Sequence, residues 1–221
     1  MTFSILARDP TTGAIGGAAA TGSLCVGGWV LRGDLAAGMS ASQGAAPSTF
    51  WGEDVLAKMR EGFPAAEAVD LITDADRGRE YRQLAALDLG GQSGAFTGAS
   101  NEPELGSRTF VNGIVSGNML ANASVLDEMV EHFTSVESPF ELRLLSTLRA
   151  AAQQGGDYRG LLSAAILVLH PERPPLTLRI DHHSSDPIGA LEDLYQLATS
   201  GQYSSWTAKV PVAADKERAL D

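Results

Sequence analysis

Hydrophobic and polar residues alternate over the first eight residues, which is the pattern of a half-buried β-strand. The predicted strand covers residues 2–8 and has two faces, Thr2, Ser4 and Leu6 on one and Phe3, Ile5 and Ala7 on the other. Pro10 and Gly13 then favour a turn, because Pro fixes φ and Gly permits positive φ. Residues 14–21 are almost all small and apolar. They predict a return strand that is buried on both faces.

The same two periodicities extend along the rest of the chain. Period-two or continuous apolar segments predict further strands at about residues 26–32, 35–42, 81–88, 93–97, 109–116, 161–170 and 176–182. Apolar residues at helical spacing, together with capping residues, predict helices at about 49–61, 64–73, 124–134, 138–153 and 187–199. Residues 74–80 and 99–108 are polar and are predicted to be connections. Residues 1–200 are expected to form one domain, with residues 201–221 as a peripheral tail.

This order of strands and helices limits the fold class. It predicts either two sheets packed together with helices outside, or one sheet with helices on one face. The chain has 221 residues, 44% of them hydrophobic, which is enough for a sizeable core. No apolar run reaches the roughly 20 residues of a membrane helix, and the first residues lack the layout of a signal peptide. We therefore expect a cytoplasmic protein.

Charge and cysteine content narrow the classes of partner. The formal net charge is −11, and such a surface repels phosphate backbones and anionic membranes. We expect no nucleic-acid or membrane partner. The single Cys25 excludes an intramolecular disulfide and favours a small buried residue. Acidic chains of this size that are rich in small residues often pair, so a homodimer is expected.

Thr2 is the first candidate for chemistry. Removal of Met1 would leave Thr2 with a hydroxyl and a free α-amine, so that one residue supplies both a nucleophile and a base. The unperturbed pKa of an α-amine is about 7.7–8.0, which suits a general base near neutral pH. Retention of Met1 would block this chemistry.

Two other groups of residues are weaker candidates. Asp181, His182 and His183 with His170 upstream could hold a metal, but adjacent histidines in a strand point to opposite faces. Residues 155–160 are rich in Gly but lack the Lys-Ser/Thr ending of a phosphate loop, so a helix end and turn are favoured. We predict no metal and no cofactor.

Several short motifs in order along residues 2–200 resemble the domain-of-unknown-function 1028 family. They are Thr2-Phe3-Ser4-Ile5, Ala7-Arg8-Asp9-Pro10, Thr12-Gly13, Ser42-Gln43, Arg82-Gln83 with Asp88, Phe96-Thr97-Gly98, Gly117-Asn118-Met119-Leu120, Gly155-Gly156-Asp157, Arg159-Gly160, Ser163-Ala164-Ala165 and Asp186-Pro187-Ile188. Each motif alone is weak, but their number and order make the resemblance specific.

This resemblance implies a fold and a mechanism. The family is grouped with the N-terminal nucleophile (Ntn) hydrolases, which implies an α+β fold of four layers, an αββα sandwich. It implies a small-molecule substrate and hydrolysis of a small amide, imide or peptide-like C–N bond, with an N-terminal nucleophile. The implied catalytic residues are Thr2, Ser4 and Asn118, with Asn118 as an oxyanion donor. The implied substrate-binding residues are Asp9, Thr21, Arg32 and Gln43.

Two alternatives stay open beside the hydrolase. The first is a catalytically inactive ligand-binding or assembly protein on the same fold. A retained Met1 would favour it, as would the loop at residues 101–107, which differs from the family's usual sequence. The second is a metal-dependent enzyme that uses His170, Asp181 and His182. The nucleophile itself could be Thr2 or Ser4, and the sequence does not name the substrate.

Overall fold

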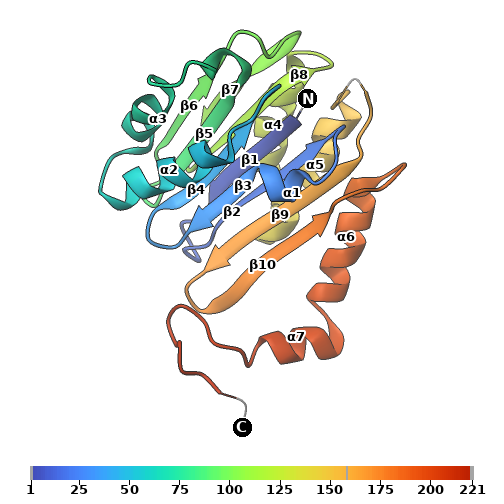
Figure 1. Ribbon diagram of the computed structural model, residues 1–221. Coiled ribbons are helices and arrows are strands. Elements are labelled where there is room, and N and C mark those ends of the chain that lie inside the picture. The colour runs from blue at the N-terminus through green and yellow to red at the C-terminus, as the bar shows by residue number, and fades with distance from the viewer. Residues whose placement is uncertain (1, 158, 220–221) are drawn as a thin grey trace.

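The structure is a computed structural model that describes residues 2–157 and 159–219 (Figure 1). It is a mixed α/β protein with two antiparallel sheets and, within the described residues, seven α-helices. In the same residues, every helix is too short or too polar to cross a membrane.

The larger sheet has six strands in the order β10-β9-β2-β1-β8-β7. Its strands are β1 (Thr2–Arg8), β2 (Ile15–Thr21), β7 (Glu104–Phe110), β8 (Gly113–Leu120), β9 (Ser163–His170) and β10 (Arg173–Ile180). The first strand of the chain is therefore central, hydrogen-bonded to β2 on one side and to β8 on the other. This placement confirms the strand that the alternation predicts at the amino terminus.

The smaller sheet has four strands in the order β3-β4-β5-β6. Its strands are β3 (Leu31–Asp34), β4 (Gly38–Gln43), β5 (Gln83–Asp88) and β6 (Ser93–Thr97). It packs face to face with the six-stranded sheet. Leu6 and Ile15 of the larger sheet share one buried cluster with Met39 and Leu87 of the smaller sheet.

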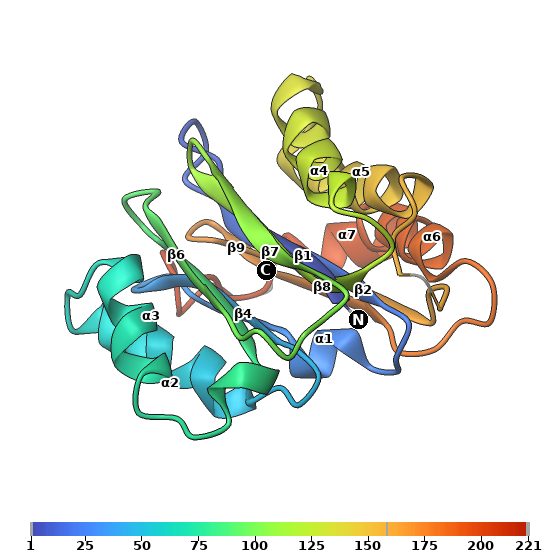
Figure 2. The same ribbon diagram turned by 90° about the horizontal axis from the view of Figure 1, so that it is seen from above.

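Helices cover the outer face of each sheet (Figure 2). They are α2 (Thr49–Arg60) and α3 (Ala65–Thr73) on the four-stranded sheet, and α4 (Ser124–Ser135), α5 (Phe140–Gln153) and α6 (Pro187–Ala198) on the six-stranded sheet. The alternation in β1 explains the division of the core. Phe3 and Ile5 pack under α4 and α5, whereas Leu6 packs between the sheets.

The small residues of β2 are required by its neighbours. A Cβ atom on Gly17 would lie 2.8 Å from Leu6 Cδ2, and one on Gly16 would lie 2.9 Å from Val168 Cγ2. Close packing on both faces therefore leaves no room for larger side chains. This observation agrees with the prediction that the return strand is buried on both faces.

The strand predicted at residues 26–32 is wrong. The chain instead forms one helical turn, α1 (Val26–Trp29), followed by β3. Cys25 takes a left-handed conformation with φ of 61°, and the Ser163 hydroxyl accepts the Val26 N–H at 3.1 Å. The helical turn thus depends on a residue that is 137 positions away in the sequence.

The loop predicted at residues 99–108 is wrong in its second half, because β7 begins at Glu104. Strand β7 is the edge of the six-stranded sheet and is mostly half-buried or exposed, so its polar sequence is that of a solvated edge strand. It forms a hairpin with β8, and Asn112 in the turn has a φ of 63°.

The C-terminal segment contains a helix that the sequence does not predict, α7 (Gly201–Thr207). None of the residues of α7 is buried, and Tyr203 and Trp206 contact each other on its surface. The chain then returns to the body, where Val212 is buried and the Ala214 N–H donates to Pro171 O at 2.8 Å. This anchor lies at the turn between β9 and β10.

Candidate functional site

Thr2 lies at the first position of the central strand, opposite Thr21 on β2 and Asn118 on β8. Its side chain points between the two sheets, because it shares a face of β1 with Leu6. Thr2 is 8% exposed, and its hydroxyl donates to Thr21 Oγ1 at 3.1 Å. Met1, whose removal the predicted mechanism requires, lies outside the described residues.

Polar side chains from both sheets gather around this end of the inter-sheet space. All of them are buried, and we call them the inter-sheet polar cluster: Thr2, Ser4, Thr21, Gln43, Gln83, Ser116 and Asn118. Strand alternation places each of them on the inter-sheet face, with the apolar residues of that face further along the strands. An otherwise apolar space between two sheets therefore ends in a concentrated set of hydroxyl and amide groups.

Gln83 is the central residue of this cluster. Its Oε1 accepts from Gln43 Nε2 at 2.7 Å and from Asn118 Nδ2 at 3.0 Å. Its Nε2 donates to Gly106 O at 3.0 Å and Gly117 O at 2.9 Å. A third acceptor of Nε2 is the hydroxyl of Thr97 on β6, at 2.8 Å. One buried amide thus connects both sheets and the β7–β8 hairpin.

Four buried polar atoms of the cluster have no hydrogen-bond partner among the described residues. They are Ser4 Oγ, Gln43 Oε1, Ser116 Oγ and Asn118 Oδ1. Ser4 and Ser116 are direct cross-strand partners, and Asn118 is opposite Thr2. Buried polar atoms are almost always paired, with protein, water or a ligand. The concentration of these atoms near Thr2 makes this region the candidate site.

A buried carboxylate lies beside the cluster. Asp157 Oδ2 accepts the Gly22 N–H at 2.6 Å, directly after Thr21, and also accepts from Arg159 Nη2 at 3.0 Å. A Cβ atom on Gly22 would lie 2.5 Å from the same oxygen. Asp157 and Arg159 therefore form a structural ion pair, and Asp157 fixes the chain at the end of β2.

Two of the predicted substrate-binding residues lie away from Thr2. Asp9 is in the turn at the far end of β1, where its carboxylate accepts from Thr11 N and Thr12 Oγ1. Burial raises the pKa of Asp9, but these hydrogen bonds and the charge of Arg143 outweigh it, so the pKa is lowered.

Arg32 lies on the opposite face of β3 from the inter-sheet space, beside α2. Its guanidinium donates to Leu31 O and Gly28 O and lies 3.6 Å from Glu53 Oε1. The structure therefore brings together Thr2, Ser4, Thr21, Gln43 and Asn118, but neither Asp9 nor Arg32.

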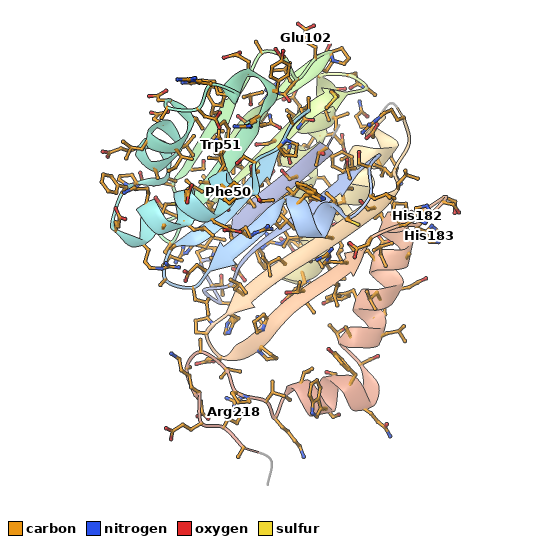
Figure 3. The ribbon with its side chains drawn as sticks, in the orientation of Figure 1. Phe50, Trp51, Glu102, His182, His183 and Arg218 are labelled. Atoms are coloured by element: carbon orange, nitrogen blue, oxygen red, sulfur yellow. The ribbon has the colours of Figure 1, made fainter. Side chains whose placement is uncertain are left out.

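The residues of the metal alternative are not brought together. His170 is at the turn between β9 and β10, where Nε2 contacts Thr12 O at 3.0 Å. Asp181 follows the other end of β10 and pairs with Arg179 at 2.8 Å. Figure 3 shows His182 in the adjoining segment before α6. Across the described part of the chain, no three His, Cys, Asp or Glu residues are placed to share a metal ion.

A cavity of about 510 Å³ lies elsewhere, between β10, α6 and α7. Its lining includes His170, Leu176, Tyr195 and Tyr203, and none of the residues of the inter-sheet polar cluster. It belongs to the C-terminal segment rather than to the site around Thr2.

Sequence reasoning did not identify Gln83 and Ser116 as site residues. One feature of the sequence could have indicated Gln83: it is a polar residue at the start of the mostly apolar strand β5. Strand alternation places it on the same face as Ala85 and Leu87, which are buried between the sheets. Ser116 likewise shares the inter-sheet face of β8 with Ile114 and Asn118.

Comparison with known proteins identifies the family. Residues 2–191 match a family of unknown function, DUF1028, so the chain belongs to this family and the resemblance of its motifs is confirmed. The crystal structure of protein SPO2555 from Silicibacter pomeroyi, which carries the same family name, is 64% identical. The similarity covers 100% of this chain and 96% of that chain, with a TM-score of 0.97. No protein with a curated description matches.

Proposed function

We propose that the protein is an Ntn hydrolase that cleaves a small amide, imide or peptide-like C–N bond, with Thr2 as nucleophile. Its two facing sheets and outer helices are then the four-layer αββα sandwich of that class. The observation that carries the proposal is the position of Thr2, which begins the central strand and places its hydroxyl in a buried polar cluster, 3.1 Å from Thr21 Oγ1.

The reaction starts once processing has made Thr2 the first residue. The α-amine takes the hydroxyl proton while Oγ1 bonds to the substrate carbonyl carbon, and the carbonyl electron pair moves to oxygen. Collapse of this intermediate breaks the C–N bond, and the α-ammonium returns its proton to the leaving nitrogen. Water then attacks the ester, again with the α-amine as base, and releases a carboxylic acid and the free hydroxyl.

The remaining cluster residues have distinct roles in this proposal. Asn118 is opposite Thr2, and its Nδ2 carries a second hydrogen besides the one donated to Gln83, so it serves as an oxyanion donor. Thr21 orients the Thr2 hydroxyl. Ser4 lies on the same face two residues inward and is 1% exposed, which favours Thr2 over Ser4 as the nucleophile.

A second candidate function is a ligand-binding protein without catalysis on the same fold. The four buried polar atoms without partners favour it, since they can bind a ligand whether or not a reaction follows.

Mass spectrometry of the protein isolated from cells tests the hydrolase directly. The expected result is a chain that begins at Thr2, and residue 1 present in every molecule would exclude the mechanism. In a screen of amide hydrolysis, Thr2→Ala should abolish activity, whereas Ser4→Ala should retain most of it. Equal activity of the two variants would assign the nucleophile to another residue.

A further inference from the structure

The orientation of the Gln83 amide is determined by its neighbours. Its two ends are chemically different, because oxygen only accepts hydrogen bonds and NH₂ only donates them. One end lies 3.0 Å from Gly106 O and 2.9 Å from Gly117 O, and backbone carbonyl groups cannot donate. That end must therefore be nitrogen, which directs Oε1 of Gln83 toward Gln43 and Asn118.

This orientation fixes the other two amides in turn. Since Gln83 Oε1 can only accept, Gln43 and Asn118 must present their nitrogen atoms to it, at 2.7 and 3.0 Å. Gln43 has a second reason for the same orientation, because its Nε2 also lies 3.4 Å from Thr2 O. The amide oxygens of both residues are consequently turned away from Gln83. Both oxygens are buried and without a partner in the described structure.

We infer that these two oxygens recognise N–H groups of the substrate, and that the substrate is an uncharged amide or ureide whose reacting carbonyl is flanked by N–H. This inference rests on the proposed function and names its substrate class. A buried acceptor that stays unpaired is unfavourable, so a ligand that supplies a donor is selected over one that cannot. The two acceptors come from opposite sheets, Gln43 from β4 and Asn118 from β8.

The charges around the site favour a neutral donor over a cation. All seven residues of the inter-sheet polar cluster are uncharged, although the net charge of the chain is −11. The neighbouring carboxylate of Asp157 is already paired with Arg159 and with the Gly22 N–H. A buried ammonium or guanidinium would find no counter-charge in the cluster, which disfavours it strongly.

Ser4 and Ser116 do not contribute to this selectivity. Each hydroxyl can donate or accept, and its hydrogen rotates to suit the group that it meets. They can therefore hold water or either polar end of a ligand. A matched control lies outside the cluster at Thr73 of α3, a buried residue whose side-chain oxygen also lacks a partner among the residues described.

The test uses probe pairs that differ only in methylation of nitrogen: hydantoin against 1,3-dimethylhydantoin, and benzamide against N,N-dimethylbenzamide. Binding is measured by calorimetry on the full chain with Thr2→Ala, processed so that residue 2 is first. The N–H member of each pair should bind about tenfold or more tightly, the selectivity expected for one unpaired buried acceptor. Equal affinity within both pairs, or no binding of either N–H compound at millimolar concentration, would overturn the inference.

Variants locate the effect on the amide oxygens. Gln43→Met keeps the length of the side chain but removes the acceptor, and should reduce the preference for hydantoin by about tenfold. Thr73→Val should leave the preference unchanged. A preference that survives Gln43→Met in a folded protein contradicts the assignment to Gln43.

A crystal structure of the Thr2→Ala protein with hydantoin tests the geometry even if Gln43→Met fails to fold. The probe should place N–H groups within hydrogen-bond distance of Gln43 Oε1 and Asn118 Oδ1. Water alone on these two oxygens, with the probe elsewhere, would refute the inference.

The binding experiment separates this inference from the proposed function, because Thr2→Ala cannot form the acyl-enzyme. Selective binding by Thr2→Ala without hydrolysis by the processed wild-type chain would refute the hydrolase alone. Equal hydrolysis of methylated and N–H substrates by the wild-type chain would refute the substrate class alone.

Discussion

Replacement of Gln83 by Leu tests how much one buried amide contributes to the stability of the protein and to the order of the inter-sheet polar cluster. Leu fills a similar volume but makes none of the hydrogen bonds to Gln43, Asn118, Gly106, Gly117 and Thr97. The two hydrogens of Gln83 Nε2 are shared among three acceptors, so these contacts amount to about four full hydrogen bonds. A buried hydrogen bond contributes about 1 kcal/mol net, so their loss predicts a destabilisation of about 4 kcal/mol. In a chain of this size that corresponds to a fall in Tm of roughly 8–16 °C.

Urea unfolding followed by circular dichroism measures this change, with two variants for comparison. Thr97→Val removes only one of the three acceptors of Gln83 Nε2 and should cost about 1 kcal/mol. Gln153→Leu makes the same substitution at an exposed position of α5 and should stay within about 0.5 kcal/mol of wild type. If Gln83→Leu were no less stable than Gln153→Leu, the amide would not organise the cluster, and the orientations derived from it would lose their basis.

Three further predictions concern the surroundings of the site and the chain ends. Gly22→Ala places a Cβ atom 2.5 Å from Asp157 Oδ2 and should destabilise the protein by about 2 kcal/mol or more in urea unfolding; wild-type stability would show that the carboxylate moves freely. Burial raises the pKa of Asp186, but the hydrogen bond from a backbone N–H of α6 and the charge of Arg149 lower it overall. A lowered pKa stabilises the fold above the unfolded value of 3.8, so the advantage of wild type over Asp186→Asn in Tm should shrink as the pH falls through and below 3.8; a constant difference would contradict this. Deletion of residues 201–221 should leave ligand binding at the Thr2 site unchanged, because the segment is anchored at the end of β9 that lies away from Thr21. Loss of binding in a folded deletion variant would show that the C-terminal segment affects the Thr2 site.

The sequence predicts the central strand well because its signal is local. Alternation in residues 2–8 and small residues in β2 follow directly from burial on two faces. It fails at α1, because the hydroxyl that accepts the Val26 N–H belongs to Ser163. It also fails at β7, whose polar residues suit an edge strand and an open loop equally well.

The candidate site shows the same difference between local features, which the sequence predicts, and long-range contacts, which it does not. Thr21 and Asn118 can be associated with Thr2 because they lie on strands that pair with β1. The contribution of Gln83 depends on how the second sheet stacks on the first, and no spacing in the chain encodes that stacking. Asp9 and Arg32 are polar residues near strand ends, yet they lie at the far end of β1 and on the outer face of β3, because the end and the face of a strand decide which groups meet.

The central position of β1 also determines how long one of its edges stays unpaired during synthesis. Strand β1 is synthesised well before one of its two partners, β8, which ends at Leu120. At about 5–20 residues per second, the ribosome needs roughly 6–22 s to proceed from the end of β1 to the end of β8. Until then β1 can pair with β2 on one side only, and afterwards it is enclosed between two strands. The processing at Thr2 that the proposed mechanism requires would compete with the arrival of β8, so slower translation of the first half should then increase the processed fraction.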